Sequence, residues 1–383
     1  MLLHRRHVVA GLGALATAAV LPGRIAFAQG TGNKRLVFII QRGAADGLGT
    51  LIPLGDPALS ASRGALIANI DPIKIDASFG LHPALANTAK LYQAGEASFV
   101  HAVASNYRDR SHFDAQNVLE TGGTGPYAQK DGWLNRLLDL LPNDDARALS
   151  LAPTVMPALR GSHAVTSYAP SALPDASADL IARVGALYQG DAALHAMFDD
   201  AVETRAATGD IAAGNGRNAA MLGEVAARLM TGAESARVVM LETGGWDTHN
   251  AQAGRLNAQL RGLDGLLGAL KTGLGPVWND TLVIVATEFG RTVAANGTGG
   301  TDHGTASAAM LLGGAVKGGR IIADWPGLRQ TDLYEGRDLK PTLGLEALIA
   351  SAVASHYGLD TDKVSRTLYP SHGGLIAVDG LIG

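Results

Sequence analysis

The decapeptide LETGGWDTHN, residues 241–250, combines acids, a histidine and two glycines directly after an apolar run. Glu242, Asp247 and His249 are residue types that bind metal ions, and the glycines let the backbone approach an ion closely. The stretch therefore predicts part of a metal site. Alternatively, it forms a tight turn in which the histidine hydrogen-bonds the backbone.

Comparable polar residues follow other apolar runs, and a Gly-rich loop carries one more pair. They are Arg42 and Asp46 after 35–40, Arg110, Ser111, His112 and Asp114 after 97–103, Glu288 and Arg291 after 281–287, and Asp302 and His303 in GTDHGT. Each group alone has a structural alternative. Ser111 would be only a helix N-cap with Asp114 as its capping partner, Asp46 a turn residue, and Glu288 with Arg291 a loop-closing ion pair.

Together, these loops hold more acids than can stay ionised side by side without positive charge among them, so a bound cation is expected. Mixed carboxylate and imidazole ligands suit zinc or manganese. The candidate ligands are Asp46, Glu242, Asp247, His249, Glu288, Asp302, His303 and His112. The guanidinium groups of Arg42, Arg110 and Arg291 would pair with a tetrahedral oxyanion such as phosphate or sulfate. His101, His163 and His372 lie outside these motifs, and we expect them to be structural.

The loops have to meet if these residues form one site, and the apolar runs indicate how. Residues 35–40, 97–103, 237–241 and 281–287 are short continuous apolar stretches, typical of buried parallel strands. Helical patterns separate them at 81–95, 112–122, 250–273 and 341–358. This alternation predicts a three-layer α/β/α sandwich with a largely parallel sheet. Ligands bind such sheets beyond the carboxyl ends of the strands.

Composition narrows the class of protein. The chain of 383 residues is 47% hydrophobic but only 5% aromatic, which favours a large α/β core. A net charge of −4 gives no reason to expect nucleic acid as a partner. The sequence contains no cysteine, which excludes disulfides, zinc–thiolate sites and cysteine nucleophiles.

The first 28 residues read as a targeting segment. Arg5 and Arg6 precede a mildly apolar stretch and an AFA cleavage signal, which predicts a twin-arginine signal peptide, with an uncleaved membrane anchor as the alternative. No later stretch is apolar and long enough for a membrane span. We expect residues 29–383 to form a single domain in the periplasm or outside the cell, with a helical insertion near 157–216.

The motifs QRGAADGL, RSHFDAQ, GGWDTH, TEFGRT and GTDHGT, spread from about Leu36 to the C-terminus, resemble the DUF1501 family of exported bacterial proteins. That family is similar in fold to the alkaline phosphatase and sulfatase superfamily, which has a two-metal site at one sheet edge. The resemblance implies metal ligation by Asp46, Glu242, Asp247, His249 and His303, and a nucleophile at Ser111. It departs at Phe289, where the superfamily has a ligating histidine, so one metal would lose a ligand unless His112, Asp114 or Asp302 replaces it.

The implied activity is hydrolysis of a phosphate or sulfate ester outside the cytoplasm, assisted by one or two divalent ions. Ser111 would attack, and Arg42, Arg110 or Arg291 would bind the non-bridging oxygens. The substrate would be an anionic small molecule or polymer. Two alternatives remain: a binding or scaffold protein that has lost turnover, and a metal-dependent enzyme of other chemistry on the same fold.

Overall fold

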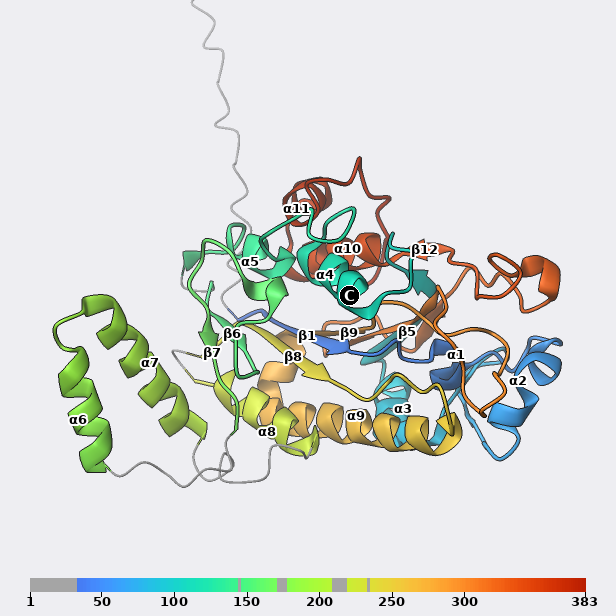
Figure 1. The fold of residues 1–383 in the computed structure, drawn as a ribbon, viewed down its shortest axis with the longest axis horizontal. Helices are drawn as coiled ribbons and strands as arrows, with labels where there is room; N and C mark the ends of the chain where they lie inside the picture. Colours follow the sequence, from blue (N-terminus) through green and yellow to red (C-terminus); the bar gives the residue numbers. More distant parts are fainter. Residues whose placement is uncertain (1–32, 144–145, 171–177, 209–218, 233–234) are drawn as a thin grey trace, which may run out of the picture. The chain divides into compact units, whose positions relative to one another are not determined.

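The computed structural model describes residues 33–143, 146–170, 178–208, 219–232 and 235–383, and Figure 1 shows its ribbon. Its central feature, within these residues, is a sheet of nine strands. The buried apolar runs predicted four of them: β1 (Arg35–Gln41), β5 (Ala97–Ala104), β8 (Val238–Thr243) and β9 (Thr281–Ala286). The predicted signal peptide lies outside the described residues.

The strand order is β11-β5-β10-β9-β1-β8-β6-β7, and β12 also pairs with β5. β1 runs parallel to both neighbours, with Leu36 opposite Val238 on one side and Leu282 on the other. The loops after these strands therefore leave from the same edge. Only β10 (Ser307–Leu312), among the described strands, is antiparallel within this sheet, to β5 and to β9. The prediction of a largely parallel sheet is confirmed.

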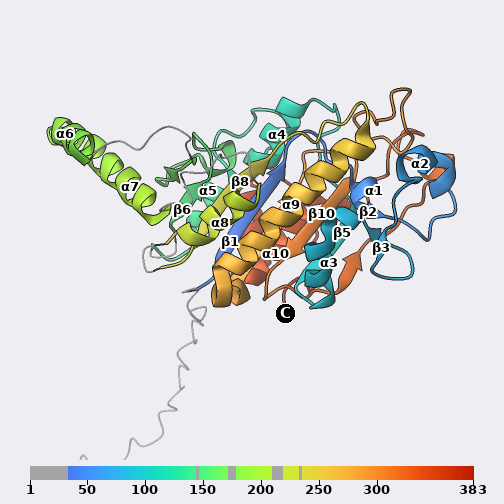
Figure 2. The same cartoon turned by 90° about the horizontal axis from the view of Figure 1, so that it is seen from below.

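Both faces of the sheet are covered by helices, which confirms the three-layer sandwich (Figures 1 and 2). Alternate side chains of β1 enter separate cores: Leu36, Phe38 and Ile40 lie in one, Val37 and Ile39 in the other. The first core is closed by α4 (His112–Thr121), α5 (Trp133–Leu138), α10 (Leu345–Tyr357) and α11 (Thr361–Leu368). The second is closed by α3 (Ala86–Gln93), α8 (Ala219–Leu229) and α9 (Gln252–Leu274).

Helix α9 follows from its leucine spacing. Leucines three and four residues apart form one apolar stripe, and Leu256, Leu260, Leu263, Leu267 and Leu270 are all 3% exposed or less. The helix ends at Gly275, whose φ of +54° suits glycine. Burial of each leucine contributes about 2 kcal/mol, so the stripe fixes the rotation of α9 against the sheet.

The remaining elements are short or lie at the margins of the sheet. They are α1 (Gly47–Thr50), β2 (Leu51–Ile52), α2 (Leu59–Ile67), β3 (Ile73–Lys74), β4 (Gly80–Leu81), β6 (Ala148–Ser150), β7 (Thr166–Ser167), α6 (Ala178–Tyr188), α7 (Ala192–Thr208), β11 (Arg320–Ile322) and β12 (Leu343–Gly344). The segment near 157–216 thus contains α6 and α7, but also β7, which pairs with β6. Its description as an insertion in a single domain stays a prediction.

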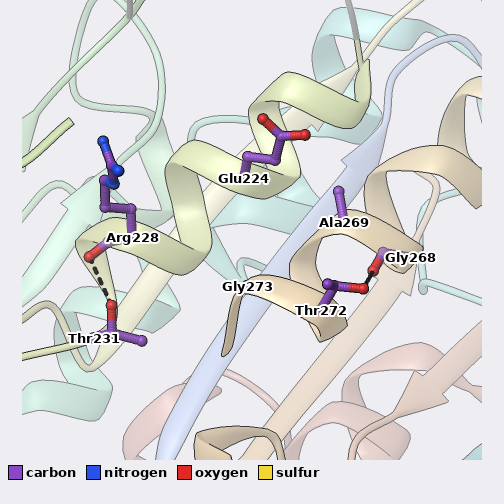
Figure 3. A pocket seen from close by; sticks show the side chains of 7 residues that line it. All are labelled: Glu224, Arg228, Thr231, Gly268, Ala269, Thr272 and Gly273. Atoms are coloured by element: carbon purple, nitrogen blue, oxygen red, sulfur yellow. Dashed lines mark hydrogen bonds between the residues drawn. The ribbon is translucent and has the colours of Figure 1, made fainter. Parts of the chain in front are cut away.

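A surface hollow of about 470 Å³ lies between α8 and α9 (Figure 3). Glu224 and Arg228 of α8 face Gly268, Thr272 and Gly273 of α9 across it. These α9 residues lie about 24–32 Å along the helix from its start at the strand-end loops, given 1.5 Å per residue. The hollow is therefore separate from the predicted site. Among the described helices, none combines the length and apolar character needed to cross a bilayer.

Candidate metal centre

The loops that carry the predicted site residues lie against one another at the carboxyl edge of the sheet. Gly43, after β1, has a φ of +115°, and a Cβ there would come within 2.7 Å of the Asp247 backbone nitrogen in the loop after β8. Gly300 lies against the backbone of His249 in the same way, with only 2.3 Å available. The glycines of these motifs thus permit the close approach that brings the strand-end loops together.

Four side chains form what we call the His/Asp cluster: His112, Asp247, His249 and His303. The Nε2 atom of His303 lies 3.0 Å from Nε2 of His112, 2.9 Å from Nε2 of His249 and 3.2 Å from Oδ1 of Asp247. Nε2 of His249 is 3.0 Å from the same carboxylate oxygen. The candidate ligand atoms of His112, Asp247 and His303 all lie within 4.8 Å of one another. The structure therefore brings together four of the predicted residues, from two loops and the start of α4.

The far side of each imidazole faces an acceptor. Nδ1 of His112 lies 2.8 Å from Glu288, Nδ1 of His303 lies 3.0 Å from the carbonyl oxygen of Arg110, and Nδ1 of His249 lies 3.4 Å from Asp302. Because these acceptors need a proton from Nδ1, the neutral rings carry it there and turn unprotonated Nε2 atoms toward one another. In this protonation state the three Nε2 atoms and the Asp247 carboxylate are all hydrogen-bond acceptors, so none of them can donate a hydrogen bond to another. A divalent cation among them would satisfy all four, and this donor set fits zinc or manganese.

Burial and neighbouring groups shift the pKa values of residues in the His/Asp cluster. Burial alone would lower the pKa of His112, but the hydrogen bond and the charge of Glu288 outweigh it and raise that pKa. Burial and the neighbouring charge of His112 lower the pKa of His303. Burial would raise the pKa of Asp247, yet the hydrogen bond and charge of Arg291 lower it. The aspartate is thus held ionised beside a neutral His303.

Glu288 was a predicted ligand, but its carboxylate is fully buried and directed to other donors. It accepts hydrogen bonds from the backbone nitrogen of Gly43 at 2.8 Å and from Gln116 at 2.9 Å, in addition to His112. These bonds outweigh burial and lower the pKa of Glu288. The structure places this glutamate behind His112, where a carboxylate orients a histidine toward a metal. Phe289 is also buried, and its ring stacks on His112 with centroids 4.9 Å apart.

Asp46 and Glu242 lie outside the His/Asp cluster. Asp46 is 1% exposed, forms an ion pair with the buried Arg63, and accepts a hydrogen bond from Gln252 at 2.5 Å. Glu242 pairs with Arg42 at the end of β1. Arginine partners thus engage both carboxylates, and their role as metal ligands stays a prediction.

The three predicted oxyanion-binding arginines all have carboxylate partners. Arg42 binds Glu120 at 2.7 Å and Glu242, Arg110 binds Asp338 at 2.8 Å and Glu335, and Arg291 binds Asp247 at 2.7 Å. Burial would lower the pKa of Arg42 and of Arg110, but their acidic partners raise both values. Each guanidinium is already paired with a carboxylate of the protein. Binding of a substrate oxyanion by these arginines therefore stays a prediction.

Ser111 is the N-cap residue of α4, with extended backbone angles of −92° and 121°. Its side chain makes no capping hydrogen bond, so the alternative in which it serves only to cap the helix is not supported. Asp114, the supposed capping partner, lies 3.5 Å from the hydroxyl of Tyr107. Ser111 as a residue is half-buried, and it directly precedes His112 of the cluster.

Sequence reasoning missed several residues that hold the site. Gln116 had a usable signal, because it lies four residues after His112 on a predicted helix and thus on the same face. Asn296 donates to Asp302 at 3.1 Å, and this bond is the main cause of a lowered Asp302 pKa. Asn296, Arg63 and Asp338 sit in stretches without a motif, so no sequence signal identified them.

Comparisons with known proteins give one clear result and several weak ones. No curated protein matches this chain. Similar solved structures include Ps i-CgsB in complex with k-i-k-neocarrahexaose, at 13% identity and a TM-score of 0.40, over 88% of this chain and 76% of that one. The phosphonate monoester hydrolase of Agrobacterium radiobacter is similar at 10% identity and a TM-score of 0.37, over 85% of this chain and 74% of that one. The C-terminal periplasmic domain of EcEptC from Escherichia coli, in complex with Zn, is similar at 9% identity and a TM-score of 0.36, over 74% of each chain.

Similarities this low support no argument about activity. The family model described as "Protein of unknown function (DUF1501)", in contrast, matches residues 33–368. These residues include every motif that forms the His/Asp cluster and its partners. The chain therefore belongs to the DUF1501 family.

Proposed function

We propose that this protein is an exported, metal-dependent hydrolase of phosphate or sulfate esters. The observation that carries the proposal is the convergence of the Nε2 atoms of three histidines and the Asp247 carboxylate, the others each 2.9–3.2 Å from His303 Nε2. His112, His249, His303 and Asp247 would hold one zinc or manganese ion. Glu288 and Asp302, as acceptors for Nδ1, would orient two of the rings.

When bound, the ion would supply a Lewis acid that stabilises negative charge on an ester oxygen. The protein's own contribution begins with Ser111, whose hydroxyl is not used in capping α4. In the proposed reaction, a bond forms between Ser111 Oγ and the phosphorus or sulfur atom, and the bond to the alcohol oxygen breaks. The serine proton passes through solvent to the departing alcohol oxygen, and water then cleaves the Ser111 ester, which releases phosphate or sulfate and restores the hydroxyl. The amino end of α4 favours the oxyanion at that position.

The first test measures metal content and turnover on the same purified protein. We expect about one zinc or manganese ion per chain, and release of nitrophenol from nitrophenyl phosphate or sulfate. His303→Ala should lose the metal, whereas His163→Ala, which removes a histidine paired with Asp139 away from the cluster, should keep it. Ser111→Ala should keep the metal and lose turnover. Equal turnover by Ser111→Ala and the parent would refute the nucleophile.

A metal-binding protein without turnover is the second candidate, because one observation favours it. Arg42, Arg110 and Arg291 are all paired with carboxylates, so none of these three guanidinium groups is free for a substrate oxyanion. In that case the purified protein would hold its metal but hydrolyse neither ester. Loss of metal from His303→Ala combined with no turnover by the parent would select this alternative.

Export is proposed from Arg5 and Arg6 and the AFA motif, and it places the reaction in the periplasm or outside the cell. The twin-arginine machinery carries folded proteins, so the metal would be bound before transport. Replacing both arginines by lysine should retain the protein in the cytoplasm, as seen by cell fractionation. Unchanged periplasmic delivery of the double variant would contradict this route.

A further inference from the structure

The ring of His303 is held differently from the other two rings of the His/Asp cluster. Carboxylate groups accept from Nδ1 of His112 and of His249, whereas Nδ1 of His303 faces the backbone carbonyl oxygen of Arg110 at 3.0 Å. A carbonyl oxygen can only accept a hydrogen bond. The proton of neutral His303 therefore has to stay on Nδ1 for as long as this carbonyl keeps its place.

The backbone of Arg110 requires support to hold that place. Its φ is +60°, in the left-handed region that residues with a Cβ rarely adopt. Support comes from its side chain, which reaches Asp338: Nε lies 3.0 Å and Nη2 2.8 Å from the same oxygen, Oδ2. The backbone conformation that presents the carbonyl to His303 is thus tied to a distant aspartate.

Asp338 is 0% exposed and serves as an anchor for two loops. Besides Arg110, it accepts hydrogen bonds from Thr305 at 2.8 Å and from Nε of Arg337 at 2.9 Å. Thr305 lies two residues after His303, and Arg337 also donates to the carbonyl oxygen of His303. One buried carboxylate therefore fixes the loop before α4 and the loop of His303 relative to each other.

We infer that Asp338 is a positioning residue of the metal centre: by binding the Arg110 guanidinium, it holds the Arg110 carbonyl on Nδ1 of His303 and keeps Nε2 unprotonated and directed into the cluster. The inference rests on the proposed metal site, but the placement of the proton is a property of the metal-free protein as well. This role also gives Arg110 a task other than the predicted oxyanion binding.

Asp338→Asn tests the inference, because it keeps the size of the side chain and removes the charge that holds Arg110. Zinc affinity, measured by calorimetry, should fall about 10–100-fold, as is typical when a metal ligand loses its orienting partner. In the metal-free, ¹⁵N-labelled protein, nitrogen chemical shifts should show His303 protonated at Nδ1 in the parent and partly at Nε2 in the variant. Glu335→Gln, which removes the exposed second partner of Arg110, is the control and should leave both readouts unchanged.

Parental zinc affinity together with an unchanged His303 tautomer in Asp338→Asn would overturn the inference. If the parent itself binds no zinc, the proposed function fails, and the tautomer in the metal-free protein still decides about Asp338. If Asp338→Asn does not fold, Arg110→Ala replaces it, because it leaves Asp338 in place and removes only the link. A parental His303 tautomer in folded Arg110→Ala would equally overturn the inference.

Discussion

Asp46 and Asp247 follow neighbouring parallel strands, and each binds a buried arginine, yet their surroundings differ. Asp46 is 1% exposed, and its partners are Arg63 and Gln252. The side chain of Asp247 is 42% exposed, and its oxygens face Arg291 and three histidines. Oδ2 of the first aspartate accepts hydrogen bonds from both of these groups, while its buried Oδ1 has no hydrogen-bond partner among the described residues. The second has one guanidinium donor and otherwise faces three Nε2 atoms, which have no proton to give it when the rings are neutral and protonated at Nδ1.

The difference teaches that a carboxylate at a strand end is not in itself a metal ligand. What decides is whether its partners are donors with protons, such as guanidinium and amide groups, or bases with lone pairs. A donor shell removes the need for a cation, whereas a shell of bases creates it. Asp46 and Asp247 should therefore respond in opposite ways when each is removed.

The largest effect is expected from Asp46→Ala. It would leave the Arg63 guanidinium buried without its carboxylate, which typically lowers the free energy of unfolding by about 3–5 kcal/mol. Urea denaturation measures this loss, and folded Asp46→Ala should still bind zinc. The matched control is Asp332→Ala, which breaks the exposed pair with Arg329 and should leave the midpoint nearly unchanged. Loss of zinc binding by folded Asp46→Ala would mean that the enclosed aspartate belongs to the metal site after all.

Asp247→Ala should give the reverse pattern. Zinc affinity should fall by at least about 100-fold, or about 2.7 kcal/mol, because the only carboxylate of the His/Asp cluster is gone. The metal-free variant should lose less stability than Asp46→Ala, because the side chain of Asp247 is 42% exposed and water can replace it beside Arg291, which also keeps its hydrogen bonds to Thr301. Calorimetry with zinc and urea denaturation after chelation give the two values. Parental zinc affinity in this variant would show that the histidines alone, or other residues, hold the ion.

The sequence predicted that both aspartates follow parallel strands, but it did not predict the contrast between them, and the limit has a physical cause. Apolar runs such as 35–40 and 281–287 fix buried parallel strands, and parallel strands bring their following loops to one edge. That was enough to place His112, Asp247, His249 and His303 together. It could not reveal Arg63 on α2 or Asp338 in a late loop, because no periodicity links them to the site. Without those partners, Asp46 looked like a ligand and Arg110 like an anion-binding residue.

The histidines also differ in their surroundings, because some lie in the apolar core and others in the His/Asp cluster. The dependence of stability on pH should reveal this difference, with a smaller effect than the two aspartate variants. His101 and His356 are each 1% exposed, and burial lowers the pKa of His101 to about 4 and that of His356 to about 3. Nε2 of His356 donates to the carbonyl oxygen of Arg35 at 2.9 Å, while its buried Nδ1 has no hydrogen-bond partner in the described part of the chain. Protonation would therefore bury a charge and a new donor with no acceptor.

The sign of the pH effect follows from these values. Below the ordinary pKa of 6.5, the unfolded chain binds protons that the folded chain refuses, so the free energy of unfolding decreases as pH falls from 6.5 toward 4. Each of the two histidines contributes up to about 1.4 kcal/mol per pH unit once the unfolded chain is fully protonated. His356→Gln should lose about 1 kcal/mol less than the parent between about pH 6.5 and pH 5.5, in metal-free protein unfolded by urea. All other titrating groups are shared by the two proteins, so the difference isolates His356. If the variant and the parent lose the same free energy of unfolding over this pH range, His356 is protonated in the folded core, and burial does not lower its pKa.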